Sequence, residues 1–236
     1  MICCLGIDIG STAVKAALLD TDGRLRAVRC RPILGRPAEA LASLLAELPA
    51  PAGPEVSVRV GVTGHGRALV QGPVQAESEV VALSRAMLLL CPGARTAIEI
   101  GGHGARYVLL HPETGALLDY GLNQQCAAGS GSFFEQQAGR LGFTVPALAA
   151  LAASAPRGAS VAGRCSVFAK SDMIHLQQKG TPVAEIAYGL CLAMARNFLA
   201  TVLRGREVEP PLLLAGGTAA NQGLIRAFAE LLELGP

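Results

Sequence analysis

The chain has 236 residues, 51% of them hydrophobic, and its 20 basic and 18 acidic residues leave a formal net charge of +2. Such a composition argues against disorder, because this many apolar residues can bury a large core. The charges are spread along the chain and form no basic stripe, which argues against nucleic acid as a partner.

Membrane insertion and disulfides are also disfavoured by the sequence. The apolar stretch 183–203 contains Glu185 and Arg196, so it does not fit a spanning segment of about 20 apolar residues. The seven cysteines are an odd number without a CxxC pair, and Met1 runs almost directly into the first apolar run with no signal peptide between. We therefore expect a reduced, cytoplasmic protein with no membrane partner.

Strand-like and helical patterns alternate from the beginning of the chain. Residues 2–9 and 13–19 are apolar runs separated by a Gly-Ser-Thr turn, which predicts an opening β-hairpin. Leucine spacing predicts a helix at 38–48, and a proline-rich loop then leads to a strand at 56–62 and a helix at 77–90.

A second round begins near residue 96. Strands are expected at 97–100 and 106–110, around another glycine turn. The elements expected after them are helices at 131–141, 146–153, 170–179 and 182–204, a strand at 211–214 and a helix at 221–234. Each half thus begins with a strand, a glycine turn and a second strand. This repetition predicts a duplicated α/β unit, divided as 1–93 and 94–236, with a ligand cleft between the halves.

Three glycine-rich turns directly follow predicted strands. They span Asp8 to Thr12, Glu99 to His103 and Ala215 to Thr218. A single such turn is usually only a tight turn, but three together indicate phosphate binding through backbone N–H groups. Asp8 closes the first strand, where a carboxylate can hold Mg²⁺ through water. No GxxxxGK[ST] string occurs, and no GxGxxG follows a strand, so neither a P-loop nor a dinucleotide site is supported.

Two of the cysteines lie beside predicted helix starts in polar, glycine-rich surroundings. Cys126 occurs in Asn-Gln-Gln-Cys-Ala-Ala-Gly-Ser-Gly, and Cys165 in Gly-Arg-Cys-Ser-Val-Phe-Ala-Lys-Ser. The positive end of a helix dipole stabilises a thiolate and suits an anionic iron–sulfur cluster. Since a cluster takes four ligands, two cysteines per chain imply a cluster shared by two chains. The alternative interpretation is that both are buried structural thiols.

Five segments in this order resemble the BadF/BadG/BcrA/BcrD ATPase family, and most closely the activator component of 2-hydroxyacyl-CoA dehydratases. They are Gly6 to Lys15, Val62 to Arg67, Asn123 to Gly131, Cys165 to Ser171 and Ala215 to Asn221. The first glycine turn alone would fit any sugar kinase, actin-like or chaperone ATPase. The two cysteine segments are the specific part of the resemblance.

The resemblance implies an acetate-kinase/actin-like ATPase fold of two ribonuclease-H-like halves, with MgATP in the cleft. It also implies a homodimer with one 4Fe-4S cluster bound by Cys126 and Cys165 of both chains. Such a dimer takes an electron from ferredoxin or flavodoxin. ATP hydrolysis then drives the electron into a partner 2-hydroxyacyl-CoA dehydratase or benzoyl-CoA-type reductase, in anaerobic metabolism.

The resemblance also identifies the residues that match the family's nucleotide-binding motifs. Those of the phosphate motifs are Asp8, Gly10, Ser11, Thr12, Lys15, Gly101 and Gly102, and those of the nucleoside-side motif are Gly216, Gly217 and Asn221. The family has Gln and Asp where this chain has His103 and Gly104, and Glu where it has Lys170. Asp8 and His103 are the candidate catalytic residues. Because a carboxylate is missing at 104, ATP hydrolysis is expected to be slow.

A second class of function remains open on the sequence. It is a sugar-kinase-like or regulatory ATP-binding protein of the same fold, with a degenerate ATPase site and incidental cysteines. A kinase needs an aspartate as general base near the bound substrate. Asp119 and Asp172 are the candidates, and neither follows a glycine-rich kinase motif.

Overall fold

The computed structural model describes residues 2–50, 56–123, 129–163 and 166–234. The chain forms two compact units, residues 1–85 and 86–236, and each is described by itself below. The division at residue 93 that the sequence predicts stays a prediction.

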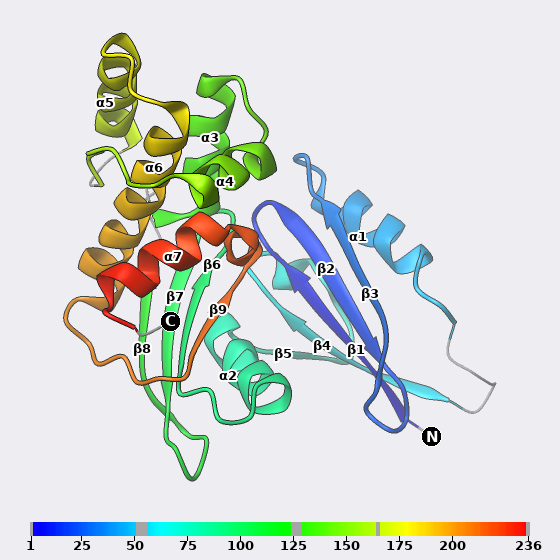
Figure 1. Ribbon diagram of the computed structural model, residues 1–236. Helices are drawn as coiled ribbons and strands as arrows, with labels where there is room; N and C mark the ends of the chain where they lie inside the picture. Colours follow the sequence, from blue (N-terminus) through cyan, green and yellow to red (C-terminus); the bar gives the residue numbers. More distant parts are fainter. Residues whose placement is uncertain (1, 51–55, 124–128, 164–165, 235–236) are drawn as a thin grey trace. The chain divides into compact units, whose positions relative to one another are not determined.

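The first unit is built on a five-stranded sheet in the order β3-β2-β1-β4-β5 (Figure 1). Its strands are β1 (Ile2–Ile9), β2 (Ala13–Leu19), β3 (Leu25–Pro32), β4 (Ser57–Thr63) and β5 (Val74–Ala76). The hairpin β1–β2 is antiparallel, whereas β4 runs parallel to β1. Helix α1 (Pro37–Ala46) begins with proline at a position where the missing N–H costs nothing, and its Leu44 packs into the core with Ile9 and Val14. Helix α2 (Glu79–Leu90) follows β5.

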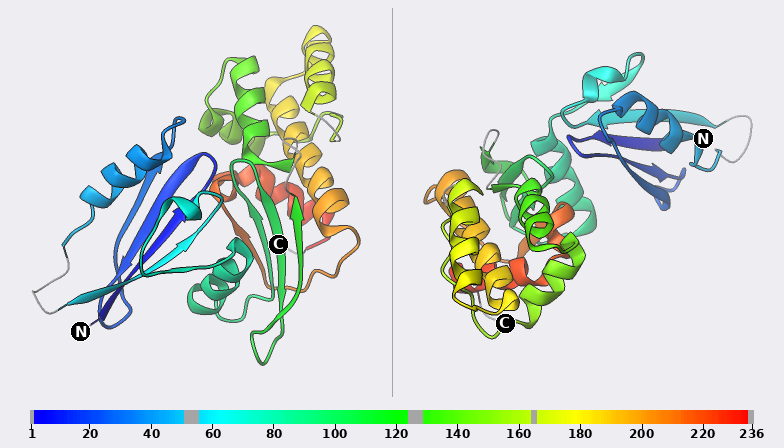
Figure 2. Two further views of the ribbon diagram at one scale, coloured as in Figure 1. Left: turned by 180° about the vertical axis from the view of Figure 1, so that it is seen from behind. Right: turned by 90° about the horizontal axis from the view of Figure 1, so that it is seen from above.

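The second unit repeats this strand arrangement and adds helices. Its sheet has the order β8-β7-β6-β9, with strands β6 (Thr96–Ile100), β7 (Ala105–Leu110), β8 (Leu117–Asn123) and β9 (Leu212–Ala215). The helices are α3 (Gly131–Leu141), α4 (Val145–Ser154), α5 (Ser166–Gln178), α6 (Val183–Phe198) and α7 (Gln222–Leu231). Figure 2 shows that α5 is the outermost of these helices, and it packs against α6.

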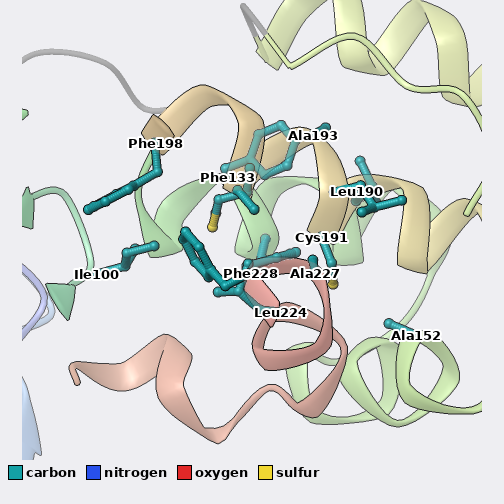
Figure 3. Close-up of a cluster of buried hydrophobic side chains, with 14 of the residues drawn as sticks. Ile100, Phe133, Ala152, Leu190, Cys191, Ala193, Phe198, Leu224, Ala227 and Phe228 are labelled. Carbon is teal, nitrogen blue, oxygen red and sulfur yellow. The ribbon is translucent and has the colours of Figure 1, made fainter. Parts of the chain in front are cut away.

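Helix α6 is the centre of the second unit. It is buried almost all round and packs against α4 and α7, as its apolar sequence on every face predicts. Phe198 at its end meets Phe228 of α7 edge to face, with ring centroids 5.5 Å apart (Figure 3). The stretch Val183–Leu203 is long and apolar enough to cross a membrane, but 78% of its most apolar window is buried inside the unit. That burial is what a core helix requires.

The structure differs from the sequence-based expectations in several elements. Strands β3, β5 and β8 are additional, and Asp119 lies within β8. Helix α5 begins at Ser166 rather than at 170, and the long helix expected at 182–204 ends as an α-helix at Phe198 and continues as a π turn, Leu199–Leu203. Among the other cysteines, Cys3 and Cys191 are buried, while Cys4 and Cys30 are exposed.

Candidate functional site

The first glycine turn joins β1 to β2. Gly10 N–H donates to the carbonyl of Ala13, 3.1 Å away, which closes the turn around Ser11 and Thr12. Asp8 and Lys15 lie opposite each other in the two strands, and Lys15 Nζ is 2.8 Å from Asp8 Oδ2. Both side chains are accessible, with exposed fractions of 34% for Asp8 and 49% for Lys15. The turn therefore presents a carboxylate and an ammonium group beside backbone N–H groups, which suits a hydrated metal ion and a phosphate.

The segment after β4 lies directly on this turn. Gly64 has φ +93°, and a Cβ there would lie 2.4 Å from the carbonyl oxygen of Ile9 and 2.6 Å from Asp8 Oδ1. Only glycine permits this close approach. Thr63 pairs with Asp8 in the sheet, and its Oγ1 is buried without a hydrogen-bond partner in the described part of the chain. A hollow of about 470 Å³ lies beside Asp8, Lys15 and Thr63, and most of the rest of its lining is apolar.

The second glycine turn joins β6 to β7 in the same way. Gly101 N–H donates to the carbonyl of Gly104 at 2.8 Å. Glu99 and Arg106 face each other across the two strands and form an ion pair, with exposed fractions of 22% and 8%. The Arg106 guanidinium also lies beside Gly104, where a Cβ would be 3.4 Å from Nη2. His103, the candidate catalytic residue, is exposed at the tip of the turn.

The third glycine turn meets the end of β6. Gly216 has φ +85°, and a Cβ there would lie 2.4 Å from the carbonyl oxygen of Ile100. Thr218 Oγ1 donates to that same carbonyl at 3.0 Å. Gly217 has open space around it. The structure thus brings the second and third turns together within the second unit.

Helix α3 begins on the second turn. The N–H groups of Gly131 and Ser132 donate to the carbonyls of Gly101 and Gly102, at 2.7 and 2.8 Å. A Cβ on Gly131 would lie 3.1 Å from the Gly101 oxygen and 3.5 Å from Thr218 Cγ2. The helix that follows the Cys126 segment is therefore hydrogen-bonded to the candidate phosphate turn.

Asn221, expected on the nucleoside side, caps α7. Its Oδ1 accepts from Leu224 N–H at 3.2 Å, and its Nδ2 lies 3.7 Å from Cys191 Sγ. Burial raises the pKa of the Cys191 thiol to about 12, against a smaller lowering by its contact with Asn221, so the thiol is neutral. Cys191 is consequently a core thiol beside the cap.

Cys126 and Cys165 lie outside the described residues. Two described residues that flank these cysteines in the sequence, Gly129 and Gly163, lie close to one side chain, Asn197 of α6. Asn197 Nδ2 donates to the carbonyl of Gly163 at 2.7 Å, and a Cβ on Gly129 would lie 2.8 Å from Asn197 Oδ1. Among the residues that the structure describes, no group of three or more His, Cys, Asp or Glu could hold a metal ion.

Each of the two aspartates considered as a kinase base forms an ion pair or hydrogen bond with another residue. Asp119 Oδ2 pairs with Arg206 Nε at 3.1 Å, and Asp172 Oδ2 accepts from Ala162 N–H at 2.8 Å. Each therefore has a structural partner.

Sequence reasoning included Glu99 in the second turn but missed its partner Arg106, and it also missed the contacts of Asn197. The matching positions of Asp8–Lys15 and Glu99–Arg106 around their turns were a readable signal, because both pairs are seven residues apart. Asn197 carried no signal, since its contacts join segments far apart in the chain.

Comparison with known proteins places the chain in a family. The model of the BadF/BadG/BcrA/BcrD ATPase family matches residues 5–234, and the chain belongs to that family. It is 32% identical to the activator of lactoyl-CoA dehydratase of Anaerotignum propionicum, over 97% of this chain and 88% of that protein. It also superimposes on the activator of the 2-hydroxyisocaproyl-CoA dehydratase from Clostridium difficile with bound ADPNP, with a TM-score of 0.86, 28% identity and coverage of 98% and 86% of the two chains.

The fold is the actin-like and sugar-kinase-like α/β ATPase fold, as the sequence predicts. A glucokinase of the ROK family from Streptomyces griseus matches with a TM-score of 0.53 at 15% identity, over 98% of this chain and 88% of that one. That likeness concerns the fold alone.

Proposed function

We propose that the protein is an ATP-dependent activator that delivers single electrons to a 2-hydroxyacyl-CoA dehydratase or a benzoyl-CoA-type reductase. The active species would be a homodimer with one bridging 4Fe-4S cluster. The observation that carries this proposal is the start of α3. Gly131 and Ser132, which follow the Cys126 segment, are hydrogen-bonded to the candidate phosphate turn at Gly101 and Gly102. The candidate phosphate turn is thus hydrogen-bonded to the helix that follows the Cys126 segment.

The nucleotide is bound, in this proposal, through the glycine turns. Asp8 orients the hydrated Mg²⁺, and Lys15 beside it neutralises phosphate charge. Gly10, Ser11 and Thr12, with Gly101 and Gly102, offer backbone N–H groups and hydroxyls to the phosphates. Gly216, Gly217 and Asn221 serve the nucleoside side, and exposed His103 orients the attacking water.

Cys126 and Cys165 of two chains would hold the cluster. When bound, it would supply one-electron chemistry between a ferredoxin or flavodoxin donor and the partner enzyme. Helix α5 begins at Ser166, the residue that follows Cys165 in the sequence, and a helix N-terminus favours a negatively charged group nearby. The residues of α3 then link this electron-transfer group to the nucleotide turn, and nucleotide binding that favours one arrangement of α3 biases the exposure of the cluster.

Anaerobic purification with iron, sulfide and mass measurements tests the function. We expect a dimer with about four irons per two chains, because a Cys₄ site needs ligands from both. Cys126→Ser and Cys165→Ser should each abolish the cluster. Cys30→Ser, at an exposed cysteine in β3, is the matched control and should retain it. A colourless, monomeric wild type prepared without air would refute the proposal, and full iron content in either serine variant would remove that ligand from it.

A further inference from the structure

Thr63, the last residue of β4, carries a buried hydroxyl. Its Oγ1 has no hydrogen-bond partner in the part of the chain that the structure describes. Burying a hydroxyl without a partner destabilises the folded state, and native proteins keep few such groups. Where one occurs in a candidate ligand site, the ligand can supply the missing partner.

Thr63 belongs to a polar row that crosses three neighbouring strands of the first sheet (Figure 1). Asp8 of β1 lies opposite Lys15 in the antiparallel hairpin and beside Thr63 in the parallel pair. Paired residues point to the same face of a sheet, and all three line the same hollow. Neighbouring strands lie about 4.8 Å apart, a span that one hydrated metal ion can bridge.

The other side chains nearby leave the hydroxyl to an outside partner. The next row on this face is formed by Gly6, Ala17 and Gly61, which carry no polar side-chain atom. Within the polar row, Lys15 Nζ donates to Asp8 Oδ2 at 2.8 Å, so these two groups bind each other. A ligand that enters beside Asp8 therefore meets a hydroxyl whose bonding capacity is unused.

Hydrogen bonds fix the backbone on both sides of Thr63. The N–H of Glu77 donates to the Val62 carbonyl at 2.9 Å. On the other side, the N–H of Gly66 donates to the carbonyl of Ile9 at 2.9 Å. The end of β4 is thus tied to the end of β1, and the hydroxyl is held beside the Asp8 carboxylate before any ligand binds.

We infer that Thr63 is a positioning residue for the metal ion of MgATP, and that its hydroxyl accepts a hydrogen bond from a water of the hydrated Mg²⁺ that Asp8 orients. The inference rests on the proposed function. Mg²⁺ keeps several waters when one carboxylate and phosphates bind it, and those waters need acceptors. A threonine hydroxyl offers two acceptor lone pairs without adding a charge. The unpaired Oγ1 fits this role.

Thr63→Val is the primary test, because valine keeps the branched shape and removes the hydroxyl. We expect two effects of opposite direction. The ligand-free variant should unfold at a urea concentration equal to or above that of wild type, because an unpaired hydroxyl is gone. The Kd for ADPNP with Mg²⁺ should rise roughly tenfold, whereas the Kd with excess EDTA should not change. Calorimetry with this non-hydrolysable nucleotide measures both constants.

Thr63→Ser is the rescue variant, since it retains the hydroxyl and should recover most of the affinity for the magnesium complex. Thr21→Val, at an exposed turn of the same unit, is the matched control and should bind like wild type. Thr63→Ala also lacks the hydroxyl and replaces the valine variant if that one does not fold.

The outcomes separate this inference from the proposed function. Wild-type affinity for the magnesium complex in the folded variants without the hydroxyl would overturn the inference and leave the proposed function intact. An equal loss of affinity with Mg²⁺ and with EDTA would also overturn it, because the hydroxyl would then act on the nucleotide or on the fold. A wild type that binds no nucleotide under either condition would instead overturn the proposed function.

Discussion

The glycine turns of the two units follow one plan. In each unit an acidic residue of the first strand pairs with a basic residue of the second, Asp8 with Lys15 and Glu99 with Arg106. A parallel third strand then delivers a glycine with positive φ onto the last carbonyl of the first strand. These glycines are Gly64 and Gly216, and each would place a Cβ 2.4 Å from the carbonyl oxygen it contacts.

The turns differ in what surrounds them. The first is open, and its ion pair is accessible to a ligand, whereas the second ion pair is mostly buried and its turn accepts the first N–H groups of α3. The same strand plan therefore yields one turn suited to a hydrated metal ion and another built into the helical part of its unit. Residues at equivalent positions of the two turns therefore need not have equivalent roles.

The largest effect is expected from the paired glycines. Gly64→Ala and Gly216→Ala should each lower the free energy of unfolding by at least about 3 kcal/mol, because strained backbone and a severe overlap with a carbonyl act together. Urea unfolding measures this. Gly23→Ala, at φ +77° with nothing within 4 Å of the added Cβ, isolates the backbone strain and should cost about 1 kcal/mol. Equal losses of unfolding free energy in the alanine variants of Gly23, Gly64 and Gly216 would show that the close approach of glycine to a carbonyl has no energetic role.

Much of this plan was open to sequence reasoning. The hairpins and their glycine turns were predicted correctly, because alternating apolar runs and turn residues are local signals. Strand β3 was missed, since its arginines at 26, 29 and 31 hide the apolar alternation, and β8 was missed because Asp119 and Gly121 interrupt it. The equivalence of Gly64 and Gly216 and the bond from Asn197 to Gly163 join segments that are distant in the chain, which no local pattern records.

The two ion pairs should respond differently to loss of their cations. Arg106→Met leaves Glu99 mostly buried without its partner and should lower the free energy of unfolding by about 2 kcal/mol. Lys15→Met breaks an accessible pair and should cost less than about 1 kcal/mol, while weakening ATP binding about tenfold through lost phosphate contact. Urea unfolding and calorimetry with ATP separate the two effects. An unchanged free energy of unfolding in Arg106→Met would mean that the second ion pair contributes as little to stability as the first.

Restoring the family residues at the second turn is expected to raise ATP hydrolysis modestly. A positioned polar group in such a site is commonly worth about a hundredfold in rate. In this turn, however, the Arg106 guanidinium lies beside residue 104, and it would pair with an aspartate introduced there. We therefore expect slow hydrolysis in wild type and a gain of about tenfold or less in the double variant His103→Gln, Gly104→Asp.

Steady-state phosphate release in the presence of the reduced cluster measures this gain. The single variant His103→Gln is the control, because it restores the amide without a new partner for Arg106. Brisk hydrolysis by wild type with no gain in the double variant would show that neither position limits the reaction.

Alkaline pH should destabilise the second unit in particular, because the buried tyrosines Tyr107 and Tyr188 lie in it. Burial raises the pKa of Tyr188 to about 12, assisted by its hydrogen bond to Glu230, and burial likewise raises the pKa of Tyr107 to about 12. Below pH 10 these hydroxyls are neutral in both the folded and the unfolded chain, so their contribution is constant. As the pH rises from 10 to 12 the unfolded chain loses these protons first, and stability falls.

Tyr188→Phe removes one of these groups and its 2.6 Å bond to Glu230. The variant should therefore be less stable than wild type at pH 8 by about 1 kcal/mol. The difference should shrink above pH 10, because only wild type then has to keep a proton on Tyr188 in order to fold. Urea unfolding of both proteins at pH values from 8 to 11.5 follows this convergence. Parallel stability curves across that range would show that Tyr188 ionises as readily in the folded unit as in the unfolded chain, and its burial in the second unit would then have no electrostatic consequence.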